Sequence, residues 1–148
     1  MDDRNNKLLS VEELKVYFRS EDEVARAVDG VSFDVEREET VCLVGESGCG
    51  KSVTSLSILG LIPSPPGEIE SGKIKIGCRN LLNFGTEKLR RIRSHNISMI
   101  FQEPMTSLNP VFTCGNQVME AVMLHQGLDK QAARKKAIEM LEMVGIPD

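Results

Sequence analysis

Apolar and polar residues alternate in two stretches near the start of the chain. In residues 8–18, LLSVEELKVYF, apolar side chains recur at every second position from Leu14, and residues 31–35, VSFDV, repeat this pattern. Because successive side chains of a strand point to opposite faces of a sheet, each stretch is typical of a half-buried strand. The polar run RSEDE predicts a turn after the first stretch, and Asp29-Gly30 predicts a turn just before the second.

Three further stretches predict strands. Residues 40–44, TVCLV, follow the charged turn EREE and show no polar alternation, which favours a strand covered on both faces, as in a parallel sheet. Residues 73–77, KIKIG, predict a short alternating strand. Residues 97–101, ISMIF, predict a strand with Ile97, Met99 and Phe101 on one side.

Helical spacing of apolar residues takes over elsewhere in the chain. The positions from Lys51 to about Leu61 suit a helix that PSPPG ends, and residues 86–93, TEKLRRIR, predict a helical turn or a short helix. Thr113 can cap a further helix that ends near His125. The chain therefore changes from mixed strands and helices to helices alone.

A last helix is expected after Asp129, which can cap its N-terminal end. Gly145 and Pro147 are expected to end it. Its apolar stripe is expected to comprise Ala133, Ala137, Met140, Leu141 and Val144.

Composition narrows the class of protein. The chain has 148 residues, 41% hydrophobic content and a net charge of -4, which suits one domain and argues against a protein that coats nucleic acid through a general positive field. Its start shows no signal-peptide pattern, and its apolar stretches fall short of the roughly 20 residues that span a bilayer, so we expect a cytosolic protein. Four widely spaced cysteines predict reduced, mostly structural thiols rather than a metal or redox site. They are Cys42, Cys49, Cys78 and Cys114.

A glycine-rich loop, residues 45–52, lies between TVCLV and the first predicted helix. Its sequence GESGCGKS fits the pattern GxxxxGK[ST]. Its three glycines allow successive N–H groups to turn inward, and the following helix adds unpaired N–H groups and the positive end of its dipole. Lys51 can then reach the β- and γ-phosphates of a nucleotide, and the Ser52 hydroxyl can bind Mg²⁺. The sequence therefore predicts a phosphate-binding loop.

A second candidate position is Gln102, at the end of the strand predicted for residues 97–101. Pro104 is expected to enforce an extended exit from that strand. A glutamine at a strand end can contact both Mg²⁺ and an attacking water molecule. Taken alone, however, such an amide is more typical of a cap or of a solvated group.

Together, GESGCGKS, the Pro-rich stretch after GLIP and the string FQEPMTSLNP resemble the ATP-binding subunits of ABC transporters, in particular those of dipeptide, oligopeptide and nickel importers. The likeness runs essentially the whole length of the chain. It implies an α/β P-loop NTPase fold, the ABC-type nucleotide-binding domain, with an N-terminal antiparallel β region. Residues 1–103 would hold the ATPase core with the Walker A loop and the Q-loop, and residues 104–148 the beginning of the helical subdomain.

The resemblance also implies ATP and Mg²⁺ as cofactors, and a role for each matching residue. Lys51 would contact the phosphates, Ser52 and Gln102 would contact Mg²⁺, and Gln102 would sense the γ-phosphate and the attacking water. The family places an aromatic residue on adenine, for which Phe18 is favoured and Tyr17 comes second, with burial in the core as the other fate. The nucleotide-binding set implied is Phe18, Gly45, Glu46, Ser47, Gly48, Cys49, Gly50, Lys51, Ser52 and Val53.

The chain also departs from the family pattern. Glu38 occupies a turn position where the family usually has glycine, which predicts strain in that turn. No apolar strand ending in Asp-Glu is present, the signature LSGGQ is absent, and neither His95 nor His125 stands where the switch histidine would. We therefore expect an incomplete cassette, the N-terminal half of an ABC ATPase domain, which binds ATP but does not hydrolyse it alone.

The implied partners are transporter permease subunits, contacted through the region after Gln102, and a second ATP-binding subunit in a head-to-tail dimer on the inner face of the cell membrane. The alternative is a non-catalytic fragment that docks on a permease. Basic clusters in residues 88–93 and 134–136 would suit a nucleic-acid-binding module, but no aromatic or base-reading residues accompany them, which favours solvated faces and no nucleic acid. The lack of an NKxD motif argues against a GTPase.

Overall fold

The computed structural model describes residues 6–102 and 107–146, and it divides into two compact units, Met1–Arg93 and Ser94–Asp148. Each unit is described by itself. Pro104 and Pro147, for which structural roles were predicted, lie outside the described residues. The functional division expected at residue 103 stays a prediction.

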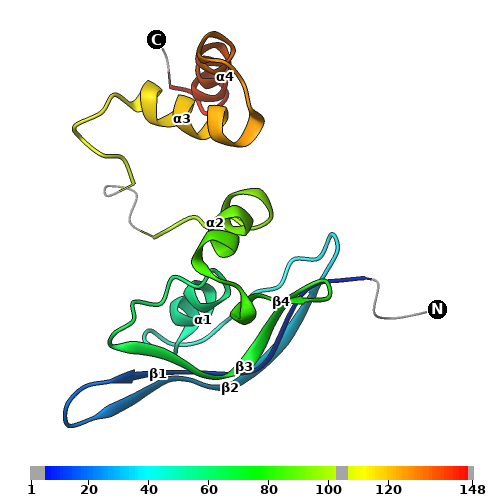
Figure 1. Ribbon diagram of the computed structural model, residues 1–148, viewed down its shortest axis with the longest axis vertical. Helices are drawn as coiled ribbons and strands as arrows, with labels where there is room; N and C mark the ends of the chain where they lie inside the picture. The colour runs from blue at the N-terminus through cyan, green and yellow to red at the C-terminus, as the bar shows by residue number, and fades with distance from the viewer. Residues whose placement is uncertain (1–5, 103–106, 147–148) are drawn as a thin grey trace. The chain divides into compact units, whose positions relative to one another are not determined.

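The first unit is built on a four-stranded antiparallel sheet with the strand order β2-β1-β3-β4 (Figure 1). Its strands are β1 (Lys7–Arg19), β2 (Val24–Glu36), β3 (Gly67–Ile76) and β4 (Arg79–Asn80). The alternating stretches thus form strands as predicted, and the N-terminal antiparallel β region is confirmed. The strand expected at KIKIG extends further toward the N-terminus, because β3 pairs with almost the whole length of β1.

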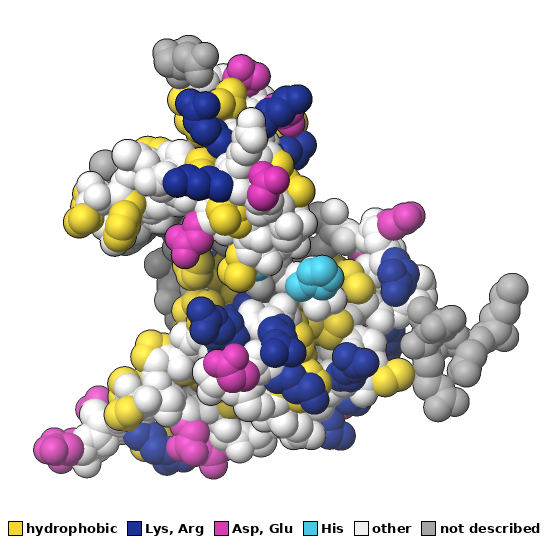
Figure 2. All heavy atoms as spheres, turned by 45° about the horizontal axis from the view of Figure 1, so that its top comes forward, with side chains coloured by type: hydrophobic (Ala, Val, Ile, Leu, Met, Phe, Trp, Pro, Cys, Tyr) yellow, Lys and Arg dark blue, Asp and Glu magenta, His cyan; other side chains and the backbone are white. Residues whose placement is uncertain are grey.

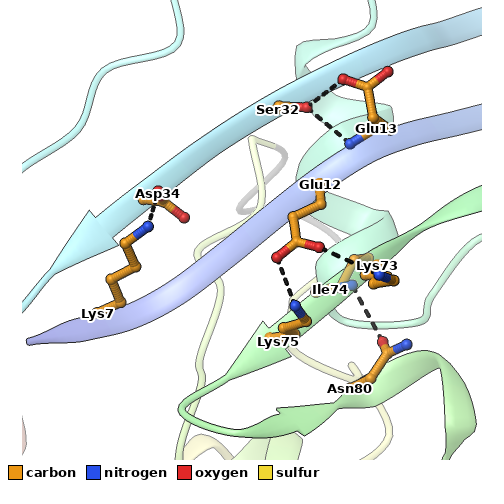
Figure 3. Close-up of polar contacts among 9 residues, drawn as sticks. All are labelled: Lys7, Glu12, Glu13, Ser32, Asp34, Lys73, Ile74, Lys75 and Asn80. Carbon is orange, nitrogen blue, oxygen red and sulfur yellow. Dashed lines mark hydrogen bonds and ion pairs between the residues drawn. The ribbon is translucent and has the colours of Figure 1, made fainter. Parts of the chain in front are cut away.

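The turn predicted at Asp29-Gly30 is wrong, because β2 runs through both residues. Gly30 has a φ of +81°, but this conformation serves an irregularity in the ladder, where the register between β1 and β2 shifts. Opposite lies Glu13 with a φ of +46°; its N–H donates to Ser32 Oγ at 2.8 Å, and Ser32 Oγ donates to Glu13 Oε1 at 2.9 Å (Figure 3). The glycine therefore accommodates a β-bulge instead of reversing the chain.

Helix α1 (Lys51–Ile58) lies over one face of the sheet and contacts β1 and β2 (Figure 1). The most deeply buried apolar side chains of the first unit are Val11, Leu14 and Val16 of β1 and Ile74 of β3. Burying each of them contributes about 1.5–3 kcal/mol to folding. The 3-10 helix η2 (Leu81–Asn83) and helix α2 (Thr86–His95) follow β4, and α2 confirms the short helix predicted there.

The strands predicted for residues 40–44 and 97–101 are not formed. Both stretches lack regular structure, with Val44 92% exposed and Ile100 98% exposed. A strand of a parallel sheet is stabilised by hydrogen-bonded neighbours and by cover on both faces. Within the described part of the chain, neither stretch pairs with a strand. Figure 2 shows apolar side chains exposed between charged ones on the face in view.

The second unit contains an antiparallel pair of helices, α3 (Cys114–Gln126) and α4 (Lys130–Met143). Both predicted N-caps are confirmed, since Thr113 accepts a hydrogen bond from the Asn116 N–H and Asp129 accepts one from the Ala132 N–H. The apolar stripe expected on α4 is buried only in its first part. Met140 and Val144 are 38% and 70% exposed. The core of the pair is Met119, Val122, Ala133 and Ala137.

None of the described helices is long and apolar enough to cross a membrane.

Candidate functional site

The glycine-rich loop leads directly into α1, as the sequence predicts. Gly48 and Gly50 have φ values of +81° and +89°, and Gly50 occupies the N-cap position of α1 in the left-handed conformation. In the part of the chain that the structure describes, no side chain caps the first turn of α1. The N–H groups of that turn are therefore available to an anion, which the helix dipole also favours at this end.

Gly50 places the end of the loop directly on β2. A Cβ atom at this position would stand 2.2 Å from the carbonyl oxygen of Ala27, so only glycine fits. At the start of the loop, a Cβ at Gly45 would stand 2.5 Å from Cys49 Sγ. The backbone of β2 thus leaves no room for a side chain at Gly50, whereas at Gly45 the neighbouring atom belongs to the cysteine side chain of the loop itself.

Lys51 folds back over the loop that precedes it. Its Nζ donates to the carbonyl oxygens of Gly45 at 2.8 Å and Glu46 at 2.7 Å, and it lies 3.5 Å from Cys49 Sγ. These contacts hold the positive charge over the concave side of the loop. Because a flexible lysine side chain can exchange carbonyl partners for phosphate oxygens, the arrangement suits an anion that carries a phosphate group.

Helix α1 offers a rigid support for the loop, although it is rich in hydroxyl residues. The Thr54 hydroxyl donates to the Gly50 carbonyl at 3.0 Å, and the Ser57 hydroxyl donates to the Val53 carbonyl at 2.7 Å. Both side chains are buried, and these bonds satisfy their polar groups. Ser52, by contrast, is exposed and remains available to a ligand of the loop.

The two candidate aromatic residues lie next to each other in β1 but have different surroundings. Phe18 is half-buried and packs against Gly67, where a Cβ would stand 2.9 Å from Phe18 Cε1. The Tyr17 hydroxyl donates to Asp29 Oδ1 at 3.0 Å, and the Arg26 guanidinium lies 5.6 Å from the centre of its ring. Tyr17 is therefore held by polar partners, while contact of either ring with a base stays a prediction.

Gln102 is exposed and belongs to the second unit, and Glu103, which follows it, lies outside the described residues. A joint site of Gln102 and the glycine-rich loop therefore stays a prediction.

The cysteines are free and exposed, so they are not part of the core as structural thiols would be. Among the described residues, no group of three His, Cys, Asp or Glu side chains is placed to hold a metal ion.

Two features of the site were not predicted from the sequence. The first is the close contact of Gly50 with the Ala27 carbonyl oxygen. It joins backbone atoms of residues far apart in the chain, and Ala27 has no distinguishing side chain. The contacts of Lys51 with the loop carbonyls also leave no trace in the sequence. Only the glycine spacing of the loop indicated that its backbone approaches other atoms closely.

Similarity to known proteins agrees with this geometry. Over 138 residues, the chain is 51% identical to the oligopeptide transport ATP-binding protein AppD of Bacillus subtilis, a match covering 93% of this chain and 42% of AppD. It is 46% identical over 141 residues to the dipeptide transport ATP-binding protein DppD of Escherichia coli, covering 95% of this chain and 43% of DppD. The chain thus spans less than half the length of these relatives.

The fold is also similar to that of the ATP-binding cassette MJ0796, whose dimer was solved in a post-hydrolysis state bound to ADP and Pi. The TM-score is 0.76 at 25% sequence identity, and the match covers 91% of this chain and 56% of the cassette. The predicted fold class, an incomplete ABC-type nucleotide-binding domain, is thereby confirmed. Residues 28–148 match the family model described as ABC transporter, and the chain therefore belongs to the ABC transporter family.

Proposed function

We propose that this chain is the ATP-binding part of an importer ATPase that couples ATP hydrolysis to the uptake of peptides or a related small solute. The observation that carries the proposal is the glycine-rich loop, with its uncapped helix N-terminus, its glycine-only contacts and Lys51 over its concave side. The names of the oligopeptide and dipeptide transport relatives support the substrate class.

The residues of the loop suit the phosphate groups of a nucleoside triphosphate. ATP would supply the phosphoryl group whose transfer to water drives transport. The N–H groups of the loop and of the first turn of α1 bind phosphate oxygens, and Lys51 leaves the carbonyls of Gly45 and Glu46 to do the same. Ser52 and Gln102 would hold Mg²⁺, Gln102 would orient water, and Phe18 would stack on adenine.

Hydrolysis requires more than this sequence contains. Phosphoryl transfer depends on groups that position water and stabilise developing charge. The sequence has no apolar strand ending in Asp-Glu, no LSGGQ signature and no histidine at the switch position. We infer that this polypeptide binds ATP but does not hydrolyse it at a useful rate alone.

The region after Gln102 is proposed as the contact with permease subunits on the inner face of the cell membrane. Three of its apolar side chains, Leu108, Val111 and Phe112, are 47%, 81% and 59% exposed, which suits a surface that a partner covers. A second ATP-binding subunit is proposed to complete a head-to-tail dimer. These exposed side chains also favour the alternative function, a fragment that docks on a permease without catalysis.

Calorimetric titration of Mg-ATP into the purified chain tests the proposal, after circular dichroism has established that each variant is folded. We expect saturable binding in the wild type, loss of at least about tenfold in affinity in Lys51→Ala because a charge-assisted phosphate contact is removed, and wild-type affinity in Lys135→Ala, which removes an exposed lysine of α4. A folded wild type that does not bind Mg-ATP would contradict nucleotide binding. Equal affinities in the three proteins would contradict the role of Lys51.

A phosphate-release assay separates binding from hydrolysis. We expect no turnover above background from the chain alone. Turnover at about 1 s⁻¹ or faster that disappears in Lys51→Ala would refute the inferred inactivity.

A further inference from the structure

A short turn, residues 109–112, precedes α3 in the second unit (Figure 1). The Phe112 N–H donates to the Asn109 carbonyl at 3.2 Å, which closes a β-turn of four residues. Pro110 stands at the second position of this turn, where proline is favoured because its φ is already fixed. The Val111 N–H donates to the Asn109 Oδ1 at 3.0 Å, so the asparagine side chain supports the same turn.

The side chain of Gln117, near the start of α3, holds both ends of this turn. Its Oε1 accepts a hydrogen bond from the Asn109 N–H at 2.9 Å, and its Nε2 donates to the Asn109 carbonyl at 3.0 Å. Nε2 also donates to the Phe112 carbonyl at 3.1 Å. An amide side chain has two N–H donors, and Gln117 uses both on backbone carbonyls of the turn. These three hydrogen bonds, the Gln117 clamp, fix the first and the last residue of the turn from one half-buried side chain.

The clamped turn presents apolar side chains to solvent. Val111 is 81% exposed, Phe112 is 59% exposed, and Leu108, just before the turn, is 47% exposed. Residues 107–119 contain no charged residue, in a chain of which 27% is charged. Because the cores of protein interfaces are poor in charge and rich in aromatic residues, this surface suits an apolar surface of another protein. Nucleic acid and anionic lipid headgroups would instead require cations here.

We propose that Gln117 is a positioning residue that holds Val111 and Phe112 in place for insertion into an apolar surface of a permease subunit. The inference rests on the proposed contact between this region and the permease. Binding must order any loop that is mobile in the free protein, and the lost conformational entropy lowers the affinity. Because the Gln117 clamp orders the turn beforehand, it raises the affinity without itself contacting the partner.

Hydrogen exchange, followed residue by residue with NMR, tests the clamp in the free chain. We expect Gln117→Leu to speed exchange of the Asn109 and Phe112 amides by at least about tenfold, because the hydrogen bonds that order the turn are lost. Gln126→Leu makes the same substitution at an exposed residue at the other end of α3, and we expect wild-type rates from it. Wild-type exchange at Asn109 in Gln117→Leu would overturn the clamp.

Binding to the permease subunits of the same transporter, reconstituted in lipid nanodiscs, tests the consequence. We expect Gln117→Leu to bind at least about tenfold more weakly than the wild type or Gln126→Leu. In a chain that also carries Val111→Ala and Phe112→Ala, we expect Gln117→Leu to have no further effect, because it acts through these two side chains. A merely structural role of Gln117 would lower the affinity equally in both backgrounds and would overturn the proposal.

The outcomes keep this inference apart from the proposed function. No binding of the folded wild type to permease nanodiscs would contradict the permease contact itself, whereas wild-type affinity in Gln117→Leu would overturn the positioning role alone. Equal binding to empty nanodiscs would assign the surface to lipid. Self-association that Phe112→Ala abolishes would assign it to a second copy of the chain, and either result would overturn the choice of partner. If Gln117→Leu does not fold, Gln117→Glu keeps an acceptor for the Asn109 N–H but has no donor, and we expect the same loss of affinity.

Discussion

Gly50 rests on Ala27 so closely that a Cβ atom at residue 50 would lie 2.2 Å from the Ala27 carbonyl oxygen. The end of the glycine-rich loop therefore packs directly on the antiparallel sheet. Val28, next to Ala27, is buried and pairs with the buried Val16 of β1, so the loop contacts the best-buried part of the sheet. The position of the loop is therefore tied to the backbone of β2 at Ala27.

Gly50→Ala is expected to displace the loop, because the new methyl group meets a backbone atom of β2 rather than the end of a flexible side chain. Gly48→Ala is the matched control. Gly48 has a similar φ of +81°, but a Cβ there meets nothing within 4 Å. We expect Gly48→Ala to lower the free energy of unfolding by about 1–2 kcal/mol, the cost of a left-handed alanine, and Gly50→Ala to lower it by more.

Urea denaturation measures both changes, and Mg-ATP titration shows whether the loop is displaced. Equal losses of stability in the two variants would mean that the contact with Ala27 is not fixed.

Acid is expected to weaken the sheet through Glu12 and Asp34. The Lys75 ammonium, which donates to Glu12 Oε1 at 2.6 Å, lowers the pKa of Glu12, with further help from Lys73 (Figure 3). The pKa of Asp34 is lowered first by the hydrogen bond from Lys7. Because both carboxyl pKa values are lower in the folded chain, their stabilising effect is present above about pH 4.5 and is lost as the pH falls below it.

The double variant Glu12→Gln, Asp34→Asn is therefore expected to show a smaller fall in unfolding free energy between pH 6 and pH 3 than the wild type. Urea denaturation at several pH values measures this fall. Glu21→Gln, in the exposed turn between β1 and β2, controls for the general effect of removing a negative charge. A double variant with the same pH dependence as the wild type would show that these ion pairs do not affect folding.

The turn after β2 stores strain, as its sequence predicts. Glu38 has a φ of +62°, a left-handed conformation that costs a residue with a Cβ about 1–2 kcal/mol. Glu38→Gly is expected to raise the free energy of unfolding by about 0.5–1 kcal/mol, since glycine removes the strain but loses more backbone entropy on folding. Thermal and urea unfolding measure the gain. Glu38→Ala keeps the strain and should show no such gain; a similar gain in that variant would locate the cause in the charge.

The elements that were predicted correctly depend on neighbours in the sequence. The strands β1 and β2 show the two-residue alternation that a half-buried sheet imposes. Thr113 and Asp129 each cap a helix by accepting a hydrogen bond from the N–H group three residues further on. The strand predictions for residues 40–44 and 97–101 were wrong. An apolar run favours burial, but it does not provide the neighbouring strands that a sheet requires. The turn prediction at Asp29-Gly30 was wrong because a glycine in the left-handed conformation suits a β-bulge as well as a turn.

The glycine-rich loop could be located from the sequence because its chemistry is concentrated in eight consecutive residues. The contacts that hold α1 in place could not be located in this way. Arg93 reaches the end of α1 from 33 and 34 residues further along the chain, and in the sequence it is one of several arginines in a basic run. Only the folded chain distinguishes it from Arg91.

The central position of β1 has a consequence for the order in which the molecule is made. β1 pairs with β2 on one side and with β3 on the other, and β3 ends at Ile76. The three long strands can therefore pair once Ile76 has left the ribosome, because β1 provides the partner of both β2 and β3. At roughly 5–20 residues per second, the sheet has several seconds in which to form and receive the glycine-rich loop while the second unit is still being synthesised.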